Sequence, residues 1–187
     1  MTTERVPVLG TTTPVEISDT IIKFCSEIDP TQTPVFINPK PDPKAIPSEY
    51  FSNVRDQIKA HGGSMQLGWI IWETPDIMLE GMFHAIWRSP DGELVDVTPQ
   101  MDGEPQILFL PDSAATIQNE EGDIVRMRRI PLVDDPLVHE FIRLSDLKDA
   151  VKVRTKGMLT MPDLAEMGEI EMERIPLQKK LALKYRG

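Results

Sequence analysis

The segment over residues 83–99 constrains the fold most, because it has the sequence of a β-hairpin. Its turn, residues 89–92, reads Ser-Pro-Asp-Gly, which is typical of a type I turn closing a three-residue loop with a left-handed glycine. That loop sets the register so that Ile86 faces Asp96. His84 and Asp96 then become diagonal neighbours on one polar face, within side-chain reach of each other.

A two-residue loop is the alternative for this turn. It would shift the pairing by one residue and place Asp96 on the opposite face from His84. With the longer loop, the face opposite His84 collects only apolar side chains, namely Phe83, Ala85, Trp87, Val95 and Val97. We therefore predict that this apolar face is the core side of the hairpin.

Length and charge limit the class of protein. The chain has 187 residues, 40% hydrophobic and 27% charged, which suits one globular domain with at most an appendage. Its net charge of -10 argues against nucleic acid and anionic membranes as partners. It carries no apolar run of transmembrane length and no signal-peptide core at its start, so we expect a cytoplasmic protein. The single cysteine, Cys25, excludes an internal disulfide.

Periodicity and turn residues predict an α+β protein, with N-terminal helices packed on a small antiparallel sheet and a C-terminal helical extension. Helices are expected over residues 18–28, 49–61, 135–151 and 162–186, and strands over residues 64–73, 77–88 and 106–111. Ser18 or Asp19 is predicted to cap the first helix and Ser48 the second, and Pro176 is expected to kink or split the last. Five prolines make residues 34–47 an extended strap.

These elements suggest three consecutive parts. Residues 1–15 are Thr-rich and are expected to be flexible. Residues 16–133 are predicted to form the α+β core. Residues 134–187 are predicted to form the helical extension, whose last helix is acidic first and basic afterwards.

Several short motifs surround the hairpin. They are Phe51-x-Asn53-Val54, His61-Gly62-Gly63, Gly68-Trp69-x-Ile71-Trp72-Glu73, Glu80, Phe83-His84-Ala85-x-Trp87 and Leu94-Val95-Asp96-Val97-Thr98-Pro99. Over residues 47–112 these motifs resemble transglutaminase-like proteins, within the papain-like class of Cys-His-Asp acyl-transfer enzymes. They are similar in particular to a little-described bacterial and phage group of this kind.

The resemblance implies a role for three residues. His84 would be the base, Asp96 would orient its imidazole, and the nucleophilic cysteine would stand at the start of the helix that begins near Tyr50. In this chain the cysteine position is occupied by Tyr50 itself. A phenol with an ordinary pKa near ~10 is a poor acyl nucleophile at neutral pH. The resemblance thus predicts the scaffold of a Cys-His-Asp enzyme and argues against its thiol chemistry.

Three residues can be considered in place of the missing thiol. Ser52 lies about 200° round the helix from Tyr50 and should not face the same groove. Cys25 lies on the apolar stripe of another predicted helix, where a lone cysteine is usually a core residue. Tyr50 itself can act as a proton donor or a binding hydroxyl beside His84, and we favour this interpretation.

Further candidates for ligand binding are Asn53, Trp69, Trp87 and Glu80. Each also has a structural interpretation: the tryptophans as core, the asparagine as a local hydrogen-bond partner and the glutamate as a solvated carboxylate. His84, Asp96 and a glutamate could form a metal ligand set, but the chain has no His-x-x-x-His pattern. We expect no metal and no cofactor.

Three functions are consistent with these observations. The first is a degenerate transglutaminase-like domain that binds a peptide or amide-bearing small ligand in a groove lined by Tyr50, His84 and Asp96. The second is an active enzyme in which His84 is the general base and Tyr50 the acid or donor, in amide hydrolysis, elimination or transfer. The third is an interaction protein whose C-terminal helices mediate assembly, for instance as a homodimer.

Overall fold

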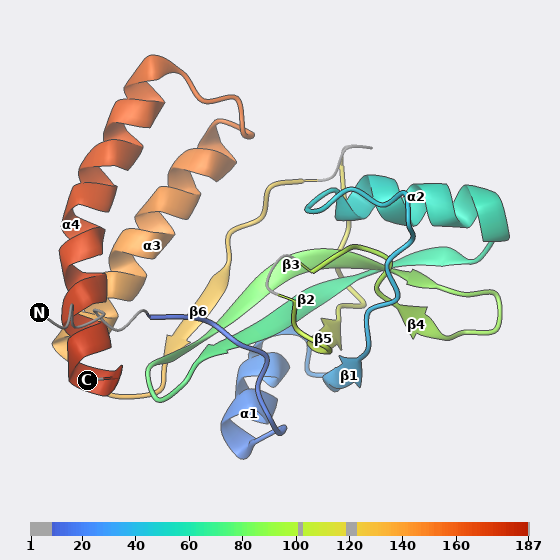
Figure 1. Cartoon of the computed structure of the whole chain (residues 1–187), viewed down its shortest axis with the longest axis horizontal. Helices are drawn as coiled ribbons and strands as arrows, with labels where there is room; N and C mark the ends of the chain where they lie inside the picture. The colour runs from blue at the N-terminus through green and yellow to red at the C-terminus, as the bar shows by residue number, and fades with distance from the viewer. Residues whose placement is uncertain (1–8, 101–102, 119–122, 187) are drawn as a thin grey trace, which may run out of the picture. The chain divides into compact units, whose positions relative to one another are not determined.

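The computed structural model of the chain describes residues 9–100, 103–118 and 123–186. Within these residues the protein is α+β, with four helices and a curved antiparallel sheet of six strands (Figure 1). The helices are α1 (Asp19–Ile28), α2 (Tyr50–His61), α3 (Pro136–Arg154) and α4 (Met161–Arg186), and the strands are β1 (Val35–Ile37), β2 (Ser64–Thr74), β3 (Met78–Arg88), β4 (Leu94–Val95), β5 (Ile107–Pro111) and β6 (Arg128–Pro131). The sheet order is β1-β5-β2-β3-β4, with β6 paired to β3.

The chain divides into two compact units. The sheet unit comprises Thr13–Trp72 and Gly81–Asp123, and the helical unit comprises Met1–Thr12, Glu73–Glu80 and Ile124–Gly187. This division differs from three consecutive segments, because the tip of the long β2–β3 hairpin belongs with the C-terminal helices. Apolar residues explain this: the tip residues Ile77 and Met78 share a buried cluster with Val138, Phe141 and Leu181.

The hairpin at β3 and β4 has the predicted register. Trp87 pairs with Val95, and the Ser89 amide donates to the Glu93 carbonyl at 2.8 Å. Gly92, with φ 89°, closes the turn in the left-handed region, as expected for a three-residue loop. The chemistry of the turn was therefore enough to predict which residues face one another.

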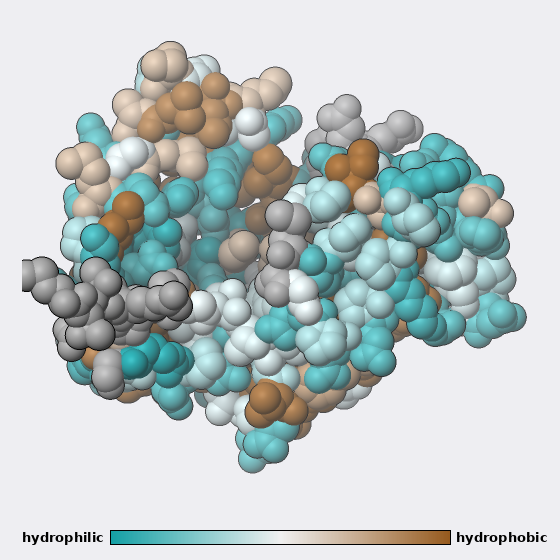
Figure 2. Space-filling model, viewed as in Figure 1, coloured by the Kyte–Doolittle hydropathy of each residue, from teal (hydrophilic) through white to brown (hydrophobic). Residues whose placement is uncertain are grey.

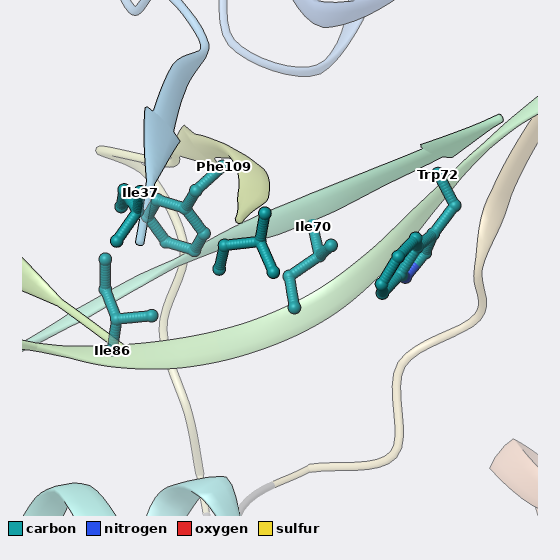
Figure 3. Packing of buried hydrophobic residues seen from close by; sticks show 6 residues of the cluster. Ile37, Ile70, Trp72, Ile86 and Phe109 are labelled. Atoms are coloured by element: carbon teal, nitrogen blue, oxygen red, sulfur yellow. The ribbon is translucent and has the colours of Figure 1, made fainter. Parts of the chain in front are cut away.

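The prediction that His84 lies on a polar face is wrong. Ile86, two residues further along the same strand and hence on the same face, belongs to a buried cluster with Ile37, Ile70, Trp72, Ile107 and Phe109 (Figure 3). Phe83 and Ala85 on the other face are buried as well. Both faces of β3 are covered here because the curved sheet and the elements packed on it enclose the strand.

The predicted N-terminal cap is confirmed for α1 and is wrong for α2. Ser18 caps α1 by accepting a hydrogen bond from the Ile21 amide at 3.3 Å. At α2 the predicted cap, Ser48, has a positive φ of 69°, and no side chain caps the helix in the described structure. The chain enters α2 differently because the Asn53 side chain binds both the amide and the carbonyl of Ile46.

The segments expected to be loose are partly ordered. Thr12 forms a two-way backbone bridge with Glu73, and Thr13 is buried with its hydroxyl donating to the Gln106 carbonyl at 2.8 Å. The expected flexibility of residues 1–15 therefore does not hold for these two threonines, and residues 1–8 lie outside the described residues. Part of the proline strap forms β1, which pairs with β5.

The two C-terminal helices match their predicted positions. Asp135 caps α3 with Pro136 at its first turn, as expected. The helix α4 continues through Pro176 instead of splitting there. None of the helices among the described residues combines the length and apolar character needed to cross a bilayer.

Asp135 is expected to make stability depend on acid pH. Its carboxylate accepts hydrogen bonds from Lys184, the Leu137 amide and the Tyr185 hydroxyl, which lower the pKa of Asp135 to about 2. Its contribution is present above the ordinary aspartate pKa near ~3.9 and is lost as the pH falls through the lowered value. The difference in free energy of unfolding between the wild type and Asp135→Asn should shrink as the pH is lowered toward 2.

Denaturant titrations at a series of pH values measure this difference. The control is Asp134→Asn, because the Asp134 side chain is fully exposed and contacts only His139 among the described residues. A gap between wild type and Asp135→Asn that does not change with pH would contradict the linkage.

Candidate functional site

The centre of the candidate site is a buried side-chain contact between His84 and Asp96. His84 Nε2 lies 3.3 Å from Asp96 Oδ2, and the two residues are 2% and 0% exposed. His84 comes from the middle of β3, and Asp96 directly follows β4. The hairpin register brings the two side chains together, as the sequence predicts.

The Asp96 carboxylate is held by three donors. Its Oδ1 accepts from the Thr98 amide at 2.9 Å, and its Oδ2 accepts from Gln100 Nε2 at 2.6 Å in addition to facing His84. A carboxylate held in this way acts as an acceptor, so the facing His84 Nε2 carries a proton and donates it to Asp96. Gln100 was not among the sequence candidates. Its only signal is its place directly after the Asp96-Val97-Thr98-Pro99 motif.

The other ring nitrogen of His84 is unsatisfied. His84 Nδ1 is buried and has no hydrogen-bond partner in the described part of the chain. In the tautomer whose single proton lies on Nε2, Nδ1 is an acceptor that lacks a donor. Buried polar atoms are nearly always paired, so this nitrogen requires an explanation.

Tyr50 lies beside this histidine. Its ring centroid is 4.6 Å from that of His84, and it is the first residue of α2. Burial, and then the nearby Glu49 carboxylate, raise the pKa of the Tyr50 phenol above its ordinary value. The phenol is therefore a neutral hydroxyl at pH 7 and not a phenolate. Tyr50, which the sequence motifs place at the cysteine position of transglutaminase-like proteins, thus lies next to His84.

Asn53 has a structural role in α2. Its amide nitrogen donates to the Ile46 carbonyl at 2.8 Å and to Thr98 Oγ1 at 3.2 Å, and its oxygen accepts from the Ile46 amide. These bonds hold the end of the proline strap against the helix. A cavity of about 300 Å³ lies nearby, lined by Asp42, Lys44, Ala45, Asn53, Asp56, Gln57 and Ala60, and none of Tyr50, His84 and Asp96 lines it.

The two candidate tryptophans are engaged elsewhere. Trp69 is buried, packs edge-on against Phe83 and donates its indole hydrogen to Asp112 at 2.9 Å. Trp87 is half-buried and donates to the Gly62 carbonyl, which ties the end of α2 to β3. Their indole N–H groups thus serve the packing of the sheet unit.

Glu80 belongs to the helical unit. Its carboxylate accepts a hydrogen bond from Arg129 Nε at 2.8 Å. It is therefore engaged by an arginine and is not grouped with His84 and Asp96. Among the described residues no three histidine, cysteine or acidic side chains are grouped as a metal site would require.

No family model, curated protein or solved structure matches this chain. The relationship to transglutaminase-like proteins therefore stays a prediction from the sequence motifs.

Proposed function

We propose that the sheet unit binds an amide-bearing ligand, such as a peptide, at Tyr50, His84 and Asp96, as a transglutaminase-like domain without the nucleophile. The observation that carries this proposal is the buried His84 Nδ1, which has no hydrogen-bond partner among the described residues and is an acceptor in the tautomer with its proton on Nε2. An amide would supply the missing N–H, and because His84 is only 2% exposed the neighbouring Tyr50 side chain must move aside to admit it. Its carbonyl can accept from the neutral Tyr50 hydroxyl next to that ring.

The start of α2 also suits the carbonyl group of an amide-bearing ligand. No side chain caps the helix within the described residues, so its first amides and the positive end of its dipole lie next to Tyr50. A carbonyl oxygen is favoured at such a helix end, for the same reason that anions are. The ligand carbonyl would therefore be oriented toward Tyr50 and its N–H toward His84.

Thiol chemistry has little support here. The thiol of Cys25 lies in α1, and burial raises its pKa to about 12, so it is not a thiolate at neutral pH. Ser52 is exposed on α2. Tyr50 occupies the position of the nucleophile with a raised pKa. These three observations favour binding over acyl transfer.

Acid-base catalysis is a second candidate, because Asp96 orients His84 through Nε2 and leaves Nδ1 as a base. With Tyr50 as the acid or donor, this arrangement could serve hydrolysis, elimination or transfer on an amide substrate. Incubation with a glutamine peptide separates the two functions, because an enzyme would release ammonia or a cleaved product and a binding domain would not. Turnover that is lost in His84→Gln would replace the binding proposal by the enzymatic one.

The binding test uses a blocked glutamine peptide, acetyl-Gly-Gln-Gly-amide, and ¹⁵N spectra of the histidine rings. We expect the free protein to show His84 with its proton on Nε2, and the peptide to shift the Nδ1 resonance. Tyr50→Phe removes only a hydroxyl and should weaken binding about 5- to 10-fold, because one hydrogen bond contributes about 1 kcal/mol. His84→Gln should abolish the binding.

The matched control is His139→Gln, since His139 is an exposed histidine in the helical unit. It should bind the peptide as the wild type does. A proton on Nδ1 of His84, or equal affinity for Tyr50→Phe and wild type, would contradict the proposal.

A further inference from the structure

The last helix, α4, has apolar residues on two separate faces. One face packs within the helical unit, where Leu181 is fully buried and Leu177 and Tyr185 contact the cluster formed by Val138 and Phe141. This face accounts for the docking of α4 on α3. It does not account for the other apolar residues of the helix.

The second face is an exposed stripe. It consists of Met161, Leu164, Met172, Ile175 and Leu183, of which Met161 and Met172 are 78% and 77% exposed. Residues eleven apart on a helix differ by only about 20° around its axis. Met161, Met172 and Leu183 are therefore nearly in line, and Leu164 and Ile175 form a parallel row. Figure 2 shows apolar side chains gathered over the end of the helical hairpin where α4 begins.

Charges beside the stripe are divided between the two halves of the helix. Glu166, Glu169 and Glu173 lie in the first half, and Lys179 and Lys180 in the second. Of these, Glu169 and both lysines form no ion pair within the described residues. Lys179 lies eighteen residues, or five full turns, after Met161 and therefore falls within the stripe. The stripe is thus apolar except at Lys179, with acidic residues in the first half of the helix and basic residues in the second.

Such a surface complements a second copy of itself in the antiparallel direction. With Met172 facing Met172 of the other copy, Met161 lies level with Leu183, and Glu169 lies about 6 Å along the axis from Lys179 of the other copy. A parallel arrangement would instead place acid against acid. A two-fold axis makes each favourable contact occur twice.

We propose that the protein forms a homodimer through antiparallel packing of α4 on α4, with the two-fold axis at Met172. This interface is distinct from the Tyr50, His84 and Asp96 site, which lies in the sheet unit. The interface buries a stripe about 33 Å long and pairs charges that have no ion-pair partner within the described residues of one chain.

Sedimentation equilibrium of the full chain tests the assembly. Wild type should approach twice the 21.1 kDa mass of one chain as its concentration rises. Met172→Glu should stay monomeric, because two carboxylates would meet at the axis. Met158→Glu is the control, since Met158 is equally exposed but precedes α4. A monomeric wild type, or a Met172→Glu protein that still dimerises, would overturn the proposal.

Cysteine cross-linking tests the direction of packing. Met172→Cys should cross-link to itself, and Met161→Cys should cross-link to Leu183→Cys when the two proteins are mixed. Met161→Cys alone should not cross-link, and if it does the helices are parallel and the proposal fails. The native Cys25 is buried and should stay unreactive in all of these variants.

Discussion

Replacing Arg129 with methionine is expected to lower the free energy of unfolding by about 3–5 kcal/mol, the cost of removing one partner from a buried ion pair. The guanidinium side chain is only 5% exposed. Its Nε donates to Glu80, and its Nη1 donates to Asp146 and Asp149. Glu80 and Asp149 are each 13% exposed, so the substitution would leave two largely buried carboxylates without their cation.

Far-UV circular dichroism during denaturant unfolding measures this loss, because α3 and α4 are the longest helices in the described structure. The three tryptophans all lie in the sheet unit, and their fluorescence reports separately on that unit. Arg143→Met is the matched control, since the Arg143 pair with Glu140 is exposed and such pairs contribute about 0–1 kcal/mol. Equal losses for the two arginine variants would show that Arg129 is not a central contact of the helical unit.

Replacing Phe109 with alanine is expected to cost about 3–5 kcal/mol, the usual range for a buried phenylalanine. Phe109 has no exposed surface and lies on β5, which is flanked by β1 and β2. Its ring packs with Ile37 and Ile70 (Figure 3) and occupies space next to Gly68, where any side chain would collide with it. The cavity left by alanine would therefore lie at the centre of the sheet unit.

Tryptophan fluorescence during denaturant unfolding follows this change. Phe36→Ala on the edge strand β1 is the control, because Phe36 is only half-buried and its removal leaves a smaller cavity. A loss for Phe109→Ala no larger than that for Phe36→Ala would mean that the sheet relaxes to fill the space.

Local patterns predicted the hairpin and most helix positions. The turn at residues 89–92 determines the register, and alternation along each strand then brings His84 to Asp96. Ser18 and Asp135 mark the starts of α1 and α3 because a cap depends on amides two or three residues away. These features depend on near neighbours, which a sequence displays directly.

Contacts between distant segments could not be predicted in the same way. Glu80 was a candidate for ligand binding or a solvated carboxylate, but it binds Arg129, which is 49 residues away and lies on a strand that the sequence did not indicate. Ser48 was expected to cap α2, but Asn53 sets the path of the chain there. In both cases a long-range or side-chain contact overrode a local preference.

The sequence by itself determined which residues of the hairpin face one another, and the placing of Tyr50 at the cysteine position of a transglutaminase-like site stays a prediction from its motifs. Only the tertiary structure decided that His84 and Asp96 are buried, that Gln100 holds the carboxylate and that His84 Nδ1 has no partner among the described residues. The physical reason is that register follows from backbone geometry over a few residues. Burial and hydrogen-bond satisfaction depend on what the rest of the chain packs against those residues.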